Sequence, residues 1–260
     1  MAIWYLLVCG VMFMAQRRLL YQPTPLTAEQ FQRQIARLGP NTSVIAPFDA
    51  IVFEPSGRPV VGTALLFHGN GGNGIDRSVL RADFEGQGYR LVLAEYPGYA
   101  ARAGALSEEA LVQDAKNLFY AVQAKYPSEP ITLVGESLGS GIAVQVAAGV
   151  RPAPARLVLI TPFMSLAKVA GNQMKALPAE FMVRDKFESF RHIRGYDGPV
   201  AVLVADKDEL VTAQAGLDLY DIAQSRGPAM LIRLSGAGHN TWWPQTTSAH
   251  WAALLGASRP

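Results

Sequence analysis

The chain has 260 residues, of which 50% are apolar and 17% are charged, and its formal net charge is +2. These values are ordinary for one globular domain with a sizeable core, and they exclude a disordered or fibrous chain. No stripe of Lys and Arg interleaved with aromatic residues is found, so composition gives no support to nucleic-acid binding. The single cysteine, Cys9, cannot form an internal disulfide, so cysteine usage leaves the redox compartment undetermined. The sequence does not indicate the oligomeric state.

The first twenty residues differ from the rest in being almost wholly apolar. Residues 2–15 carry no charged side chain, and Gln16-Arg17-Arg18 ends the run. As one helix, residues 2–15 would extend ~21 Å, which is less than the roughly 30 Å thickness of the hydrocarbon core. We interpret residues 1–20 as a single N-terminal membrane anchor. The alternatives are a signal-like segment, which would give a soluble or exported form, and a helix packed on the domain. The side of the membrane is left open.

Residues 21–43 are predicted to connect this anchor to a domain that spans residues 44–260. Tyr21-Gln22-Pro23-Thr24-Pro25 has the composition of a stiff linker. Thr27 and Gln30 form a capping-box pattern that begins a short helix, which ends before Gly39-Pro40.

Within the domain, apolar strand-like runs alternate with helical patterns. The predicted strands are Val60–Phe67, Tyr89–Glu95, Ile131–Gly135, Leu157–Ile160, Val200–Ala205 and Met230–Leu234. The predicted helices are Ser78–Gln87, Ser107–Lys125, Leu138–Ala148, Thr212–Arg226 and Thr247–Leu255. This alternation predicts an α/β fold with a mainly parallel central sheet and helices on both faces. Residues 162–198 carry no clear strand and are predicted to form a short lid, which we call the lid segment.

The strongest chemical signal is Gly135-Glu136-Ser137-Leu138-Gly139, between a predicted buried strand and a predicted helix. A sharp turn at this place forces the serine into a strained conformation, so the residues two positions away on either side must be small. The following helix directs its N–H groups at the reacting oxygen. Ser137 is therefore the candidate nucleophile. The non-catalytic alternative is an ordinary turn between a strand and a helix, in which the serine caps the N-terminus of the helix.

A second signal, His68-Gly69-Asn70-Gly71-Gly72-Asn73, follows the strand that ends at Phe67. Acyl transfer needs two backbone donors for the tetrahedral oxyanion, and Asn70 and Leu138 occupy the positions where these donors are expected. The same loop also fits a dinucleotide fingerprint, Gly69-x-Gly71-x-x-Gly74, with Glu95 at the end of the next strand. That alternative, an NAD-binding Rossmann oxidoreductase, leaves the serine turn unexplained.

The remaining two members of a Ser-His-Asp set are expected after the last two strands. Asp208 lies in the loop after Val200–Ala205, and Asp206 competes with it for the role of triad acid. Asp208 is favoured because the acid normally lies a few residues into this loop. Among the four histidines, His239 in Gly236-Ala237-Gly238-His239-Asn240 follows the last strand, and His250 lies within a predicted helix. His239 is thus the candidate base.

Two further groups of residues have weaker signals. Tyr96-Pro97-Gly98-Tyr99 is expected to pack beneath the loop around Asn70, with a substrate contact as the alternative. In the lid segment, the apolar side chains are predicted either to pack on the sheet or to line an acyl pocket. The candidate substrate-binding residues are Phe163, Met164, Phe181 and Met182.

In this order, these motifs resemble the α/β-hydrolase superfamily from about residue 44 to residue 260. The chain is similar to a small-lidded, N-terminally anchored branch that includes depalmitoylases, lysophospholipases and bacterial hydrolases. This closer resemblance rests on residues 16–23, His68-Gly69-Asn70, residues 95–99 and Pro162-Phe163-Met164-Ser165-Leu166. Ala100 departs from the glycine common in that branch, which leaves the geometry of its loop open. Because no palmitoyl-anchor cysteine cluster is found, the similarity to depalmitoylases does not extend to the substrate.

The sequence therefore predicts a serine hydrolase that cleaves an ester or thioester of a small-molecule or lipid acyl substrate, without a cofactor or metal. A serine aminopeptidase-like amide hydrolase is the alternative within this class, and it would need Glu136 or Glu95 to bind the free amine. From a different class, a non-catalytic membrane-tethered binding module stays open beside the Rossmann oxidoreductase.

Overall fold

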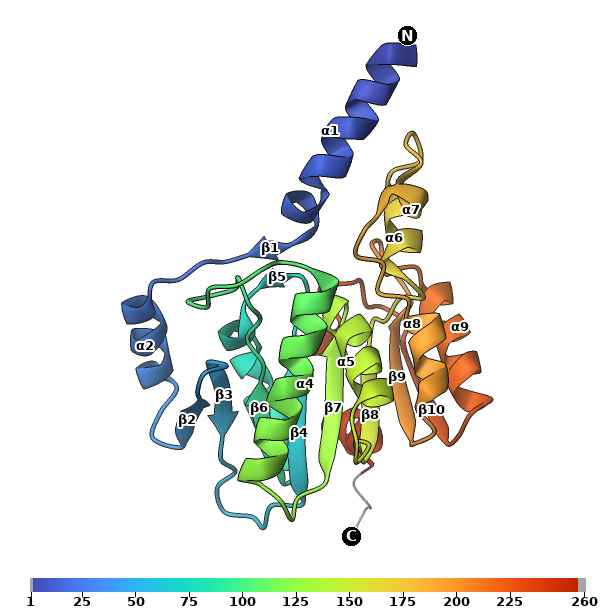
Figure 1. Cartoon of the computed structure of the whole chain (residues 1–260). Coiled ribbons are helices and arrows are strands. Elements are labelled where there is room, and N and C mark those ends of the chain that lie inside the picture. Colours follow the sequence, from blue (N-terminus) through green and yellow to red (C-terminus); the bar gives the residue numbers. More distant parts are fainter. Residues whose placement is uncertain (1, 257–260) are drawn as a thin grey trace.

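The computed structural model describes residues 2–256, and an eight-stranded sheet runs through its centre (Figure 1). The strand order is β10-β9-β8-β7-β4-β6-β3-β2. Pairing from β10 to β6 is parallel throughout, whereas β3 pairs antiparallel with both β6 and β2. The strands are β2 (Thr42–Ile45), β3 (Ala50–Phe53), β4 (Gly62–Phe67), β6 (Tyr89–Leu93), β7 (Ile131–Glu136), β8 (Arg156–Ile160), β9 (Val200–Ala205) and β10 (Ala229–Leu234).

Helices cover both faces of this sheet, and each face has its own apolar core. On one face lie α4 (Glu108–Lys125), α5 (Leu138–Gly149), α8 (Ser189–His192) and α9 (Ala213–Gln224). On the other lie α3 (Arg81–Gly86) and α10 (Ser248–Leu255), where the rings of Phe84 and Trp251 are 4.8 Å apart. The predicted α/β fold with a mainly parallel sheet is confirmed. Because parallel strands end at the same edge, the loops after β4, β7, β9 and β10 meet there.

Helix α1 (Ala2–Leu20) projects from that same edge, beside the lid segment (Figure 1). Residues Ile3–Leu20 have a mean hydropathy of 1.3 and none of them is buried. By length and composition α1 is therefore long and apolar enough to cross a membrane, and a signal sequence has the same properties. The lid segment lies between β8 and β9 and contains α6 (Leu166–Gln173), α7 (Ala179–Met182), α8 and the 3-10 helix η2 (Ile193–Gly195).

The segment after α1 differs from the predicted linker. Its residues form β1 (Gln22–Pro23), which pairs in parallel with β5 (Gly71–Gly72), and the N–H of Leu26 donates to the carbonyl oxygen of Ala100 at 2.9 Å. Ala100 has a φ of 44°, a conformation that favours glycine and explains the glycine preference at this position. The capping box predicted at Thr27 is confirmed at the start of α2 (Ala28–Arg37).

Other boundaries also shift. The strand predicted from Val60 begins only at Gly62, and Val61 is exposed. The helix predicted at 78–87 consists of the 3-10 helix η1 (Gly74–Leu80) followed by α3. The remaining short element is the 3-10 helix η3 (Trp243–Gln245).

Candidate active site

Ser137 lies at the tight turn between β7 and α5. Its backbone angles, φ 50° and ψ −115°, are outside the regions that non-glycine residues ordinarily occupy. The turn is held because the Ser137 N–H donates to the Ile160 carbonyl at 3.0 Å and the Ser140 hydroxyl donates to the Ser137 carbonyl at 2.6 Å. This geometry presents the serine hydroxyl at the edge of the sheet.

The glycines on either side of Ser137 are required by close backbone contacts. A Cβ at Gly135 would lie 2.4 Å from the Gly139 carbonyl oxygen, and a Cβ at Gly139 would lie 2.0 Å from the Phe67 carbonyl oxygen. Both distances are far below van der Waals contact, and both neighbours are backbone atoms that cannot rotate away. The sequence requirement for small residues at these positions is confirmed.

We expect Gly139→Ala to lower the free energy of unfolding by about 1–3 kcal/mol or more, because β4 must shift away from α5 to admit the methyl group. Urea-induced unfolding followed by circular dichroism measures this change. Gly86→Ala is the matched control, since a Cβ at Gly86 would meet no atom within 4 Å. Equal stability of the two variants would contradict the tight contact between α5 and the end of β4.

The structure brings Ser137, His239 and Asp208 together. The Nε2 atom of His239 is 2.8 Å from the Ser137 Oγ, and its Nδ1 atom is 2.7 Å from Asp208 Oδ2. The side chains of His239 and Asp208 are 7% and 2% exposed, so solvent scarcely competes for these hydrogen bonds. The competing acid, Asp206, instead accepts a hydrogen bond from Arg233 Nε at 2.9 Å.

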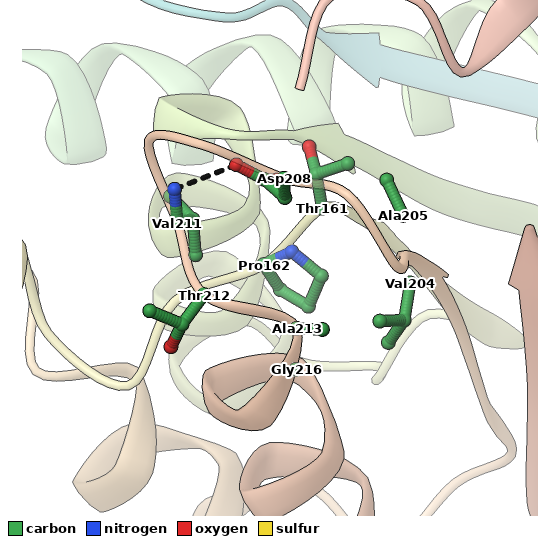
Figure 2. A pocket seen from close by; sticks show the side chains of 9 residues that line it. All are labelled: Thr161, Pro162, Val204, Ala205, Asp208, Val211, Thr212, Ala213 and Gly216. Atoms are coloured by element: carbon green, nitrogen blue, oxygen red, sulfur yellow. Dashed lines mark hydrogen bonds between the residues drawn. The ribbon is translucent and has the colours of Figure 1, made fainter. Parts of the chain in front are cut away.

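The loop after β9 fixes the Asp208 carboxylate from behind. Its Oδ1 atom accepts hydrogen bonds from the N–H groups of Leu210 at 2.9 Å and Val211 at 2.7 Å. Figure 2 shows the second of these bonds, and Thr161 and Pro162, which follow β8, line the same small cavity as Asp208. One carboxylate oxygen is thus held by the backbone, and the other is left to His239.

The loop from His68 to Gly72 lies opposite Ser137 and rests on two tyrosines. The Tyr96 hydroxyl donates to the His68 carbonyl at 2.7 Å, and the Tyr99 hydroxyl donates to the Asn70 carbonyl at 2.8 Å. Burial raises the pKa of both phenols above their ordinary value, so both remain protonated donors. The prediction that this motif packs beneath the loop is confirmed.

The two carboxylates considered for amine binding both have partners. Glu95 is fully buried, accepts a hydrogen bond from the Gly74 N–H at 2.9 Å, and lies 3.4 Å from His68 Nε2. Glu136 pairs with Arg77 through two contacts of 2.5 and 3.2 Å. Glu95 is therefore not free to meet a ribose hydroxyl, as the dinucleotide-binding alternative requires.

A cavity of about 550 Å³ opens at Ser137, a volume suited to a small ligand. Its polar walls include Asn70, Arg77, Glu136 and His239. Asn70 and Leu138 both line it, and the N–H of Leu138, as the first residue of α5, has no acceptor within the helix. Within residues 2–256, no group of three or more His, Cys, Asp or Glu side chains is arranged to hold a metal ion.

The candidate lid residues take different positions. Phe163 lines the cavity at Ser137, and Met182 lines a second cavity beside α1. Met164 lines a third, smaller cavity bounded by α6 and the start of α9. Phe181 lines none of these three cavities, and its side chain is 87% exposed. The prediction that Phe181 lines a substrate pocket is therefore wrong. Ala179 is buried at the start of α7, and two residues of helix turn Phe181 to the opposite side, whereas Met182 returns to the inner face.

Three residues beside the cavity were not expected from the sequence. Arg77 reaches it from η1, Leu20 reaches it from the end of α1, and Gln22 reaches it from β1. The Asn70 side chain also donates a hydrogen bond to the Leu20 carbonyl. No local motif signals these contacts, because they depend on the course of residues 20–26 across the sheet edge.

The fold and the grouping of side chains at the carboxyl edge of its sheet define an α/β hydrolase. Residues 59–191, just over half of the chain, match the family model described as serine aminopeptidase, S33. The chain belongs to this family of the α/β-hydrolase superfamily. Ser137 lies inside the matched region, whereas Asp208 and His239 follow it.

Curated relatives include an uncharacterised protein of Mycobacterium tuberculosis, 33% identical over 68% of this chain and 62% of that protein. Lysophosphatidylserine lipase ABHD12 of Danio rerio is 27% identical, over 65% of this chain and 48% of that protein. Alpha/beta hydrolase domain-containing protein 17B of Homo sapiens is 28% identical, over 68% and 60% of the two chains. The chain thus spans less than two thirds of the length of these relatives.

Among solved structures, the Pyrococcus furiosus esterase Pf2001 aligns with a TM-score of 0.72 at 13% identity, over 91% of this chain and 97% of that chain. Est1E from Butyrivibrio proteoclasticus, with ferulic acid bound, aligns with a TM-score of 0.63 at 16% identity, over 81% and 95% of the two chains. At these identities the likeness concerns the fold alone.

Proposed function

We propose that this hydrolase cleaves carboxylic esters or thioesters through an acyl-enzyme on Ser137, with His239 as general base and Asp208 as the orienting acid. The observation that carries the proposal is the hydrogen-bonded chain from Ser137 Oγ through His239 to Asp208, at the floor of an open cavity. In such a chain the base accepts the serine proton and the acid stabilises the imidazolium that forms.

The reaction has two steps. His239 Nε2 takes the Ser137 proton while Oγ attacks the carbonyl carbon, and the N–H groups of Asn70 and Leu138 hold the oxyanion. The imidazolium then protonates the departing alcohol or thiol, leaving the acyl group on Ser137. A water molecule, deprotonated by His239, attacks the acyl-enzyme, and the proton returns to Ser137 as the carboxylic acid leaves.

An ester or thioester fits this site better than a peptide with a free amino terminus. An aminopeptidase needs an unpaired carboxylate near the scissile bond. Glu136, the carboxylate that lines the cavity, is neutralised by Arg77, and Glu95 is buried beneath the loop. The aminopeptidase name of the family model therefore gains no support from the charges of this site.

The proposal includes membrane attachment through α1, supported by its apolar composition and exposed side chains. Two relatives are named as a lysophosphatidylserine lipase and a hydrolase-domain protein, and the first name favours an acyl lipid as substrate. A lipid or other small acyl compound is the substrate class that we propose, and the lid segment is the cover of its site.

Labelling by a fluorophosphonate probe tests this function. The full chain in detergent is expected to react with one equivalent of probe, and mass spectrometry is expected to find the adduct on Ser137. Heat-denatured protein is the control, since labelling then depends on the folded site. A panel of acyl esters, thioesters and aminoacyl anilides separates the substrate classes. A folded chain that never labels and cleaves none of them would favour a non-catalytic binding module.

A further inference from the structure

Helix α1 and the lid segment enclose a second cavity of about 420 Å³. Its walls are mainly apolar. Met12, Phe13 and Leu19 contribute from α1, and Ala170, Met174 and Leu177 contribute from the lid side. A cavity of this volume is within the range of ligand-binding pockets, and apolar walls of this kind suit a hydrocarbon chain. Its walls come from both the segment expected to be an anchor and the segment expected to be a lid.

This apolar cavity adjoins the cavity at Ser137. The two cavities share part of their lining. The shared apolar residues are Leu20, Leu166, Val169 and Leu210, and the shared polar residues are Gln22, Asn70 and Gln173. A ligand could therefore place its carbonyl carbon at Ser137 and its chain along α1. The polar side of the first cavity, at Arg77 and Glu136, remains for the leaving group.

We infer that α1 is a wall of the acyl-binding site, so that a single-chain acyl lipid leaves the bilayer between α1 and the lid segment and reaches Ser137 with its chain still against α1. This inference rests on the proposed function and extends it. The anchor then acts in substrate selection as well as in attachment.

Polar contacts fix the position of α1 against the lid segment. Arg17 donates to both carboxylate oxygens of Asp185, at 2.8 and 2.9 Å, and the Asp185 side chain is only 5% exposed. The Gln16 side chain donates to the Met182 carbonyl at 3.2 Å and accepts from the Arg184 N–H at 2.7 Å. A two-point carboxylate–guanidinium pair defines orientation as well as distance. The apolar cavity is therefore enclosed by a defined pairing of two segments.

The other end of this wall is fixed to the reaction site. Strand β1 pairs with Gly71 and Gly72, and the Asn70 side chain donates to the last carbonyl of α1, that of Leu20. The end of α1 thus joins the same loop that carries the proposed oxyanion donor. A chain held along α1 consequently approaches Ser137 from a fixed direction.

The surroundings of the cavity indicate a lipid from the bilayer as its occupant. The apolar side chains of Ile3, Trp4, Leu6, Leu7 and Met14 on α1 are exposed, and so is that of Phe181 in the lid segment. Both segments project from the same edge of the domain (Figure 1). An acyl chain moving from the membrane into this cavity stays among apolar side chains, which avoids the cost of exposing it to water.

The test compares two tryptophan substitutions on neighbouring residues of α1. Met12 lines the cavity, whereas Val11 lies outside it and is 57% exposed. Full-chain protein in mixed detergent micelles is assayed on nitrophenyl palmitate and nitrophenyl butyrate. Met12→Trp is expected to lower the palmitate-to-butyrate ratio of kcat/KM about tenfold, equivalent to about two methylene groups losing their burial. Val11→Trp is expected to keep the wild-type ratio.

A second variant, on the opposite wall of the cavity, controls for the possibility that Met12→Trp acts by disturbing α1 itself. Ala170→Phe on α6 fills the same cavity and is expected to lower the ratio as well, and fluorophosphonate labelling shows that each variant retains a folded site. An unchanged ratio in both cavity variants would overturn the inference and leave the proposed function standing. A wild-type protein that hydrolyses neither of the two esters and does not react with the probe would overturn the proposed function, and this inference with it.

Discussion

Ser137→Ala is expected to lower kcat for ester hydrolysis by about 10⁶-fold, the loss seen when the nucleophile of a serine-triad enzyme is removed. The physical reason is that the Ser137 hydroxyl is within hydrogen-bond distance of His239 Nε2, and no other hydroxyl donates to that nitrogen among the described residues. Initial rates on a short nitrophenyl ester measure the change, and the fluorophosphonate adduct should disappear in parallel.

Ser140→Ala supplies the matched control for this substitution. The Ser140 hydroxyl lies one helical turn further along, donates to the Ser137 carbonyl, and does not line the cavity. Losing one such hydrogen bond costs about 1 kcal/mol, which allows a rate change of about tenfold at most. If Ser137→Ala retained the activity of Ser140→Ala, another nucleophile would have to carry the reaction.

The positions of the main strands and helices were predictable because a parallel sheet imposes a simple pattern on the sequence. Strands buried on both faces, such as β7 and β9, are continuous apolar runs, and β10 was found in the same way although it lies at the sheet edge. The short pair β2 and β3 was not distinguished, because four residues each, around the turn at Ala46-Pro47, give too little periodicity.

The site was predictable where a motif dictates backbone geometry. Gly135 and Gly139 flank Ser137 because backbone atoms occupy the space of a side chain, and such a requirement is visible in one sequence. The choice between Asp206 and Asp208 was closer, since both follow β9. The course of the loop decides between them. The N–H of Val211 holds the Asp208 carboxylate, which faces His239, whereas the Asp206 carboxylate faces Arg233.

The parts that sequence could not indicate depend on long-range packing. The pairing of Gln22 with Gly71 and the ion pair of Arg17 with Asp185 join segments about 50 and 168 residues apart, and no local pattern marks either partner. The prediction that Phe181 lines a pocket is wrong for a related reason. A one-turn helix has no periodicity from which to infer its inner face, so an apolar residue there gives no sign of its direction.

Asp208→Asn is expected to lower kcat by about 10⁴-fold with little change in KM, because the substitution forces the wrong tautomer on His239. The backbone N–H groups of Leu210 and Val211 need an oxygen acceptor, so the carbonyl oxygen of the new amide stays with them. Its NH₂ group then faces His239 Nδ1. That nitrogen must become an acceptor, the ring proton moves to Nε2, and Nε2 can no longer take the proton of Ser137.

Asp206→Asn provides the comparison that isolates this effect. Its carboxylate contacts Arg233 near the surface, so its neutralisation is expected to change kcat by no more than about a few fold, in keeping with the small energies of exposed ion pairs. Steady-state kinetics of both variants on the same short ester, with thermal unfolding to check the fold, measure the difference. The reverse pattern, with the large loss in Asp206→Asn, would mean that the loop after β9 turns in the working enzyme and that Asp206 is the acid. Equal and small losses would mean that His239 keeps its tautomer without a carboxylate, and the proposed role of Asp208 would fall.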